Sequence, residues 1–170
     1  MDGLERRSLS VLKIGFPDFP ALAEELDISD VGARLGELLD GLTDPVLRLD
    51  GTVLMYDQAV LLGVWGAPHP VPDHARLALQ AAETAMRAAV SAVRGSSLRA
   101  RGGLVTGEGI VGLGGSRIRK AYGVFGKLGD DADRLFWEAG SSRLAVSAAT
   151  WREARRPAYA GNPDPVVLAF

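Results

Sequence analysis

The stretch VLKIGFPDFPAL, residues 11–22, decides the fold of this chain. Its first half is an apolar run interrupted only by Lys13, which is typical of a strand that is buried in a sheet. Pro17 and Pro20 then favour a helix start, because proline is tolerated in the first turn of a helix. We therefore expect a strand over 8–16 that leads directly into a helix.

The rest of the chain alternates segments with strand-like and helix-like patterns. We expect helices, from apolar residues at helical spacing, over 21–42 with a break near 27–30, over 72–93 and over 130–138. We expect strands over 46–50, 52–56, 59–65, 97–105, 109–113, 120–125, 142–147 and 165–169. A turn at Thr106-Gly107-Glu108 is expected between two of these strands. This order of elements predicts an α/β (α+β) fold, a ferredoxin-like sandwich.

Composition excludes several classes of protein. The 170 residues fit one domain over 1–170, and the formal net charge of -2 gives no general attraction to nucleic acid or anionic lipid. The absence of cysteine rules out disulfides and thiolate chemistry. No apolar run approaches the ~18 residues of a membrane span, so no membrane insertion is expected. The charged start, 1–7, does not resemble a signal peptide, and we expect a cytoplasmic bacterial protein.

Five further motifs follow residues 11–22 in a fixed order: DGTV (50–53), VLLGVWGAP (60–68), PDHA (72–75), TGEGIVG (106–112) and YGVFG (122–126). None of them is specific alone. As an ordered set over residues 9–151, they resemble the catalytic domain of class III adenylate and guanylate cyclases. The resemblance implies a central, mostly antiparallel sheet with flanking helices. It also implies active sites that lie at a dimer interface.

The resemblance also identifies the positions where two aspartates would hold two divalent ions. These positions fall on Gly15 and Ala59, and neither side chain has an oxygen atom. Asp18 and Asp57 lie nearby, but an offset of two or three residues on a strand displaces the carboxylate or turns it to the other face. We therefore expect no metal and no other cofactor, and we expect aspartates at both positions to restore a metal site.

The positions that select the base and hold the ribose are also altered. The resemblance places Met55 and Ala121 at the base-selecting positions, and neither can read a base edge. The resemblance also implies an asparagine and, four residues later, an arginine that hold the ribose and stabilise the transition state. Asp130 stands at the asparagine position, and Arg134 keeps the arginine. Arg134 could still contact a phosphate, but we favour an ordinary helix ion pair with Asp130, four residues earlier.

Three other local patterns are expected to be structural. GEGIVG (107–112) matches the dinucleotide-binding pattern GxGxxG, but a strand-like segment follows where that motif needs a helix. The glycine-rich segment 112–117 could bind phosphate, but a hairpin tip is favoured. His69 and His74 could bind a metal, but no acids stand at a recognisable ligand spacing, so we expect neither to do so.

These substitutions predict a catalytically inactive cyclase-like domain, a regulatory or protein-interaction module in bacterial signalling. One alternative is a noncatalytic nucleotide sensor that retains phosphate contact through Arg134, and a weaker one is a subunit of a heterodimeric cyclase. The expected partner is a second copy or a related cyclase-like or signalling protein. Leu113 and Ile118 are candidates for the interaction surface. Ile118 best distinguishes a contact surface from the monomer's own core, because residues with so many charged neighbours are seldom in a core.

Overall fold

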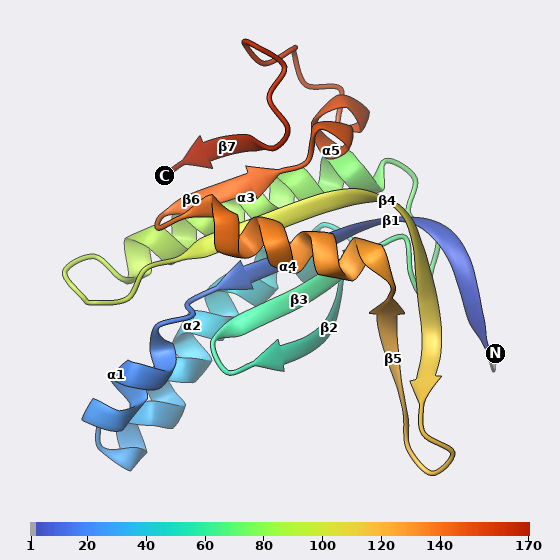
Figure 1. The fold of residues 1–170 in the computed structure, drawn as a ribbon. Helices are drawn as coiled ribbons and strands as arrows, with labels where there is room; N and C mark the ends of the chain where they lie inside the picture. The colour runs from blue at the N-terminus through green and yellow to red at the C-terminus, as the bar shows by residue number, and fades with distance from the viewer. Residues whose placement is uncertain (1–2) are drawn as a thin grey trace.

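The computed structural model describes residues 3–170, and within them seven strands form one sheet (Figure 1). The strands are β1 (Leu4–Gly15), β2 (Thr52–Asp57), β3 (Val60–Trp65), β4 (Arg101–Gly115), β5 (Lys120–Phe125), β6 (Arg143–Val146) and β7 (Val166–Ala169). The helices are α1 (Phe19–Glu25), α2 (Ile28–Arg48), α3 (His74–Ala92), α4 (Lys127–Ala139) and α5 (Ala148–Glu153). None of these helices has the length and apolar composition needed to cross a bilayer.

The sheet is mostly antiparallel, as expected. Its strands follow the order β2-β3-β1-β4-β6-β7, and β5 pairs with β4. Among the paired strands that the structure describes, only β4 and β6 run parallel. The expected α+β sandwich is therefore confirmed.

The longest pairing joins the two central strands, β1 and β4. Their register runs from Leu4 opposite Gly112 to Gly15 opposite Arg101. Successive side chains of β1 point to opposite faces of the sheet. Leu12 belongs to the core cluster formed with α2 and α3, whereas Val11 belongs to the cluster formed with α4. Figure 1 shows the same layers, with α4 on one face and α2 and α3 on the other.

Helix α2 is longer than the sequence pattern indicated. The expected strand over 46–50 was wrong, because α2 continues to Arg48. Leu38, Leu42 and Val46 are all buried at intervals of four residues, so they share one face of a helix. This face packs in the same core cluster as β1, and that tertiary contact stabilises the helix beyond its apparent end.

Strand β4 is continuous where a turn was expected. The turn predicted at Thr106-Gly107-Glu108 was wrong, since all three residues pair with β1. The glycines serve close packing instead. A Cβ atom on Gly109 would lie 2.9 Å from Cδ1 of Leu9 and 3.0 Å from Cδ2 of Leu128. The chain reverses later, between β4 and β5, as expected for the glycine-rich segment.

Helix α4 lies unusually close to β4 at Gly103. A Cβ atom at this position would lie 2.4 Å from the backbone nitrogen of Phe136 and 2.6 Å from the carbonyl oxygen of Ala132. Backbone atoms of a helix cannot move aside as a flexible side chain can. The missing side chain at Gly103 therefore sets how closely α4 can approach the sheet.

We predict that Gly103→Ala lowers the free energy of unfolding by about 1–3 kcal/mol, because α4 must move away from β4. Gly36→Ala is the matched control, since Gly36 lies in α2 with no atom within 4 Å of the added Cβ. The control should be slightly stabilising, by about 0.5–1 kcal/mol. Denaturant unfolding of both variants measures the difference, and equal stabilities would refute the packing role of Gly103.

Candidate functional site

The two positions where metal ligands were sought lie side by side at the end of β1. Gly15 pairs with Val60, the first residue of β3, and the backbone N–H of Phe16 donates a hydrogen bond of 3.0 Å to the carbonyl oxygen of Ala59. The antiparallel register of β1 and β3 brings them together. The sequence motifs therefore identified two positions, Gly15 and Ala59, that are adjacent in the structure. Two ligands of one metal site must be adjacent in this way.

The structure leaves no room for a side chain at Gly15. A Cβ atom there would lie 2.2 Å from the carbonyl oxygen of Ala59 and 2.6 Å from Cα of Val60. The φ angle of Gly15 is 155°, at the margin of the region that favours glycine. Ala59 is fully buried. The expectation that aspartates would simply restore a metal site is thus at odds with the backbone, which occupies the space that the first carboxylate would need.

Lys13 places a cation in a cavity beside these two positions. This cavity has a volume of about 110 Å³ and is lined by Lys13, Phe16, Pro17, Pro20, Asp57, Gln58, Val60, Phe136 and Trp137. The Lys13 ammonium forms an ion pair with Asp133 of α4 and lies 4.9 Å from the centre of the Phe136 ring. The ammonium of Lys13, paired with Asp133, is thus the cation that the structure places beside these two positions.

The sequence patterns did not reveal the role of Lys13. Its signal was a single charged residue inside the otherwise apolar run 11–16, which demands a partner when the strand packs against a helix. Asp133 and the aromatic faces of Phe136 and Trp137 supply that partner. Asp57 lines the same cavity, and Asp18 is exposed at the start of α1.

The two base-selecting positions do not meet within one chain. Met55 lies on β2, next to an irregularity in the β2–β3 register, and its side chain is 52% exposed. Ala121 lies on β5, opposite Gly114 of β4. Strands β3, β1 and β4 separate β2 from β5 in the sheet order. Neither residue offers a polar side chain to a base.

Arg134 does not pair with Asp130, so the expected ion pair was wrong. Its guanidinium lies 3.1 Å from Glu138 and 3.6 Å from Asp131, both on the same helix. Lys127 also contacts Asp131, at 2.7 Å. Exposed pairs of this kind stabilise a helix by only a few tenths of a kcal/mol.

Arg134 nevertheless lines a polar cavity of about 260 Å³. The other residues around it are Val105, Thr106, Lys127, Leu128, Asp131, Leu135, Ser147, Ala149, Asp164 and Pro165. Asp130 is exposed and does not line this cavity. Of the two residues expected to hold ribose and phosphate, the structure thus places only Arg134 at a hollow in the surface.

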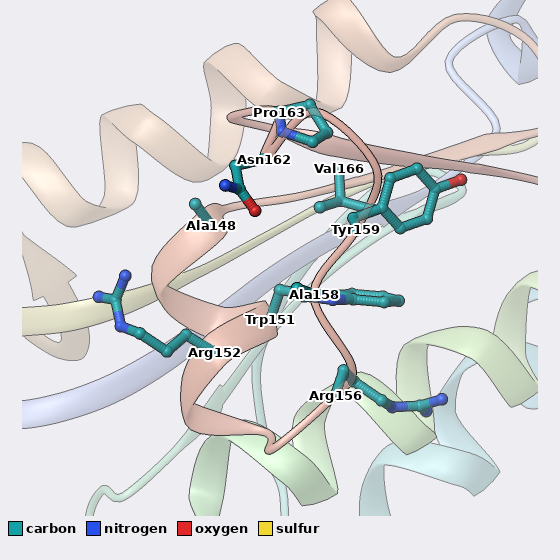
Figure 2. Close-up of a pocket in the computed structure, with 9 residues that line it drawn as sticks. All are labelled: Ala148, Trp151, Arg152, Arg156, Ala158, Tyr159, Asn162, Pro163 and Val166. Atoms are coloured by element: carbon teal, nitrogen blue, oxygen red, sulfur yellow. The ribbon is translucent and has the colours of Figure 1, made fainter.

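A larger cavity, about 310 Å³, lies under the loop between α5 and β7 (Figure 2). Trp151 and Tyr159 meet edge to face in its wall, with ring centres 5.6 Å apart. The Trp151 indole N–H donates to the carbonyl oxygen of Pro157 at 2.8 Å, and Arg156 contacts Glu83 at 3.0 Å. None of the expected site residues lines this cavity, so it is separate from the candidate site.

His74 has a structural role in a chain of hydroxyl groups. Its Nδ1 lies 2.8 Å from Oγ of Ser10, and its Nε2 lies 3.1 Å from Oγ of Ser8. The chain continues from Ser10 to Thr106 at 2.7 Å, and Thr106 accepts a hydrogen bond of 2.8 Å from Thr150. Ser10, Thr106 and Thr150 are buried, so these hydrogen bonds satisfy polar groups that lie away from bulk water. Across residues 3–170, no group of three His, Asp or Glu side chains could hold a metal.

Sequence and structure comparisons both find proteins that are named as cyclases. No family model matches the chain. Over 136 residues, 76% of the chain, it is 30% identical to Adenylate cyclase 1 of Rhizobium meliloti (strain 1021). The chain spans 20% of that protein's length.

Two solved structures share nearly the whole fold. The guanylyl cyclase Cya2 matches with a TM-score of 0.82 and 24% identity, over 97% of this chain and 91% of the other. The adenylyl cyclase CyaB from P. aeruginosa matches with a TM-score of 0.82 and 21% identity, over 97% of this chain and 94% of the other. The resemblance that the sequence motifs indicated is thereby confirmed.

We predict that Gly15→Asp lowers the free energy of unfolding by about 2 kcal/mol or more, because the added side chain collides with the Ala59 backbone. Gly36→Asp, at an open helix position, is the matched control and should change stability little. Calorimetry should show no gain in manganese affinity for Gly15→Asp combined with Ala59→Asp. A fully stable double variant that binds manganese more tightly than wild type would show that the strand junction does have room for a carboxylate.

The environment of His74 predicts a pH-dependent stability. Burial lowers the pKa of His74 from its usual 6.5, and the charge of Glu153 opposes this shift. As the pH falls through 6.5, the unfolded imidazole takes up a proton that the folded one resists, so stability decreases.

Thermal melts from about pH 7.5 to about pH 5.5, a range that brackets the imidazole titration, measure this effect. The melting temperature of wild type should fall more steeply on acidification than that of His74→Gln. His69→Gln, at an exposed loop position, is the control and should follow wild type. An equal slope in wild type and His74→Gln would show that His74 does not cause the loss.

Proposed function

The chain has the fold of the class III nucleotidyl cyclase catalytic domain, and on that premise we propose that it is a catalytically inactive domain of this type. Its role is that of a regulatory or protein-interaction module in bacterial signalling. A cyclase of this type depends on two divalent ions that activate the ribose hydroxyl and neutralise the triphosphate. The proposal therefore depends on whether this chain can hold those ions.

The contact between Gly15 and the Ala59 backbone carries the proposal. The 2.2 Å approach means that a carboxylate at Gly15 requires a different backbone, not merely a different side chain. Ala59, the other ligand position, is an alanine buried in the core. Loss of both ligands removes several kcal/mol of transition-state stabilisation.

The residues around the site support the same conclusion. Lys13 supplies a fixed positive charge in the neighbouring cavity, already paired with Asp133. Met55 and Ala121 provide no hydrogen-bonding group that could select adenine or guanine. The surviving Arg134 is engaged by Glu138 and Asp131.

The surface of the β4–β5 hairpin favours an interaction role. Ile118 is 91% exposed at its tip, as expected for a contact residue. Leu113 is only half-buried, opposite Tyr122. Leu104 and Val111 are fully buried and belong to the monomer's own core. We propose that the hairpin pairs this domain with a second copy or a related domain.

A noncatalytic nucleotide sensor is the second candidate, and the polar cavity beside Arg134 favours it. Lys127 and Arg134 both line this cavity, with the Thr106 and Ser147 hydroxyls nearby. Titration with ATP, GTP and cyclic nucleotides, with and without magnesium, tests it. Saturable binding that Arg134→Ala abolishes would favour the sensor over a pure interaction module.

We predict that the purified chain makes no cyclic nucleotide from ATP or GTP, with magnesium or manganese, above a boiled control. The physical reason is the absence of any carboxylate at Gly15 and Ala59 to hold the ions. Product analysis by mass spectrometry measures this directly. Metal-dependent turnover that Arg134→Ala abolishes would overturn the proposal, because it would show a working active site.

A further inference from the structure

The cavity between α5 and the loop that follows it has no part in the proposed function, yet its walls have the features of a small-molecule site (Figure 2). Its volume of about 310 Å³ lies at the lower end of the range for ligand pockets, about 300–1,000 Å³. A space of this size suits a molecule with one or two rings rather than a nucleotide.

The loop that closes this cavity is tied to the body of the domain at both ends. The backbone N–H of Ala148, at the start of α5, donates a hydrogen bond of 3.0 Å to the Asp164 carboxylate. The Arg156 guanidinium contacts both carboxylate oxygens of Glu83, in α3, at 3.0 and 3.1 Å. These bonds shape the cavity without a ligand, so binding costs little conformational entropy.

One part of the cavity wall is aromatic and apolar. Trp151 and Tyr159 pack edge to face, with ring centres 5.6 Å apart, and the Arg156 guanidinium lies 5.7 Å from the centre of the Trp151 ring. Pro163 and Val166 also line the cavity. Aromatic rings favour offset and edge-to-face contacts with further rings, so this part of the wall suits a planar aromatic group.

Another part of the wall carries a cation without a counter-charge. Whereas Arg156 is paired with Glu83, no carboxylate of residues 3–170 lies within ion-pair distance of Arg152. Asn162 lines the same cavity, and in Figure 2 its side chain and that of Arg152 lie on the same side as Ala148.

These polar groups match a carboxylate. None of the nine residues around the cavity carries a carboxylate of its own. A guanidinium binds a planar carboxylate through two parallel hydrogen bonds, and the Asn162 amide can donate a further one. One unpaired cation, that of Arg152, balances one negative charge.

We propose that this cavity binds a small aromatic carboxylate, whose ring packs in the aromatic part of the wall and whose carboxylate accepts hydrogen bonds from Arg152 and Asn162. The inference goes beyond the proposed function, because none of the residues around this cavity lines the one beside Gly15 and Ala59.

Calorimetric titration with 2-naphthoate tests the proposal, because this probe joins two fused rings to one carboxylate. We expect saturable one-to-one binding with a Kd of about 1 mM or tighter. The neutral analogue 2-naphthamide has the same rings and should bind at least about tenfold more weakly. Acetate, which lacks the rings, should show no measurable binding.

Nuclear magnetic resonance locates the bound probe. The chain has three tryptophans, and the indole N–H signal of Trp151 is identified by its loss in Trp151→Phe. This signal should shift as 2-naphthoate saturates the protein, because Trp151 lines the cavity. The signals of Trp65 and Trp137, which do not line it, should stay in place.

Three variants separate the charge and the space of the cavity. Arg152→Gln should raise the Kd for 2-naphthoate at least about tenfold and abolish the preference for the acid over the amide, which a purely structural role would not change. Arg155→Gln is the matched control, since Arg155 is exposed nearby but does not line the cavity, and it should bind like wild type. Ala148→Leu keeps every charge but places a larger side chain in the wall, and it should prevent binding.

Thermal melts confirm that each variant folds, and 2-naphthoate should raise the melting temperature of wild type but not that of Ala148→Leu. The proposal is overturned by the absence of saturable binding up to about 10 mM, by equal affinity for acid and amide, or by an unchanged Kd in Arg152→Gln. Binding that leaves the Trp151 signal unshifted would also overturn it, because the probe would then lie elsewhere. The cyclic-nucleotide assay is independent of all these outcomes, so failure of the inactive-domain proposal is distinguished from failure of this one.

Discussion

The pairing of β1 with β4 is the constraint on which the rest of the structure depends. The two strands stay in register from Leu4 opposite Gly112 to Gly15 opposite Arg101. At one end this register brings Gly15 against the start of β3, and at the other it lets β4 run on with β5 as a hairpin. Both the closed site and the exposed tip are thus consequences of one long ladder. Helix α4 contributes Asp133 to this arrangement only because Gly103 lets it approach β4.

Much of this fold could be predicted from the sequence, because hydrophobic periodicity reports which faces are buried. The predictions of a turn at 106–108 and a strand over 46–50 were wrong because one residue type can serve two purposes. Glycine at 107 and 109 indicated a turn, but it also permits close packing inside a strand, and only the packing of Leu9 and Leu128 decides between the two. Val46 has high strand propensity, but its tertiary contacts retain it in α2.

The candidate site was predictable in place but not in detail. Comparison with known motifs brought Gly15 and Ala59 together, because they lie where two adjacent strands meet and the order of those strands is common to the fold. The ion-pair partners of individual side chains could not be predicted from the motifs. Arg134 has acids three and four residues away along the helix, and spacing alone cannot choose among them. The partner of Lys13 lies 120 residues away, so only the folded chain reveals it.

The close approach at Gly15 also bears on how such a domain evolves. A lost catalytic aspartate can usually be regained by a single reversion, as long as the surrounding backbone keeps its old shape. Here the backbone fills the space that a side chain would need, so selection would first have to reopen the strand junction before a carboxylate could return. That intermediate would lose stability without gaining a ligand, so on the proposal of an inactive domain its descendants would diversify through their surfaces. A substitution of Gly15 by aspartate alone is therefore not enough to make a ligand.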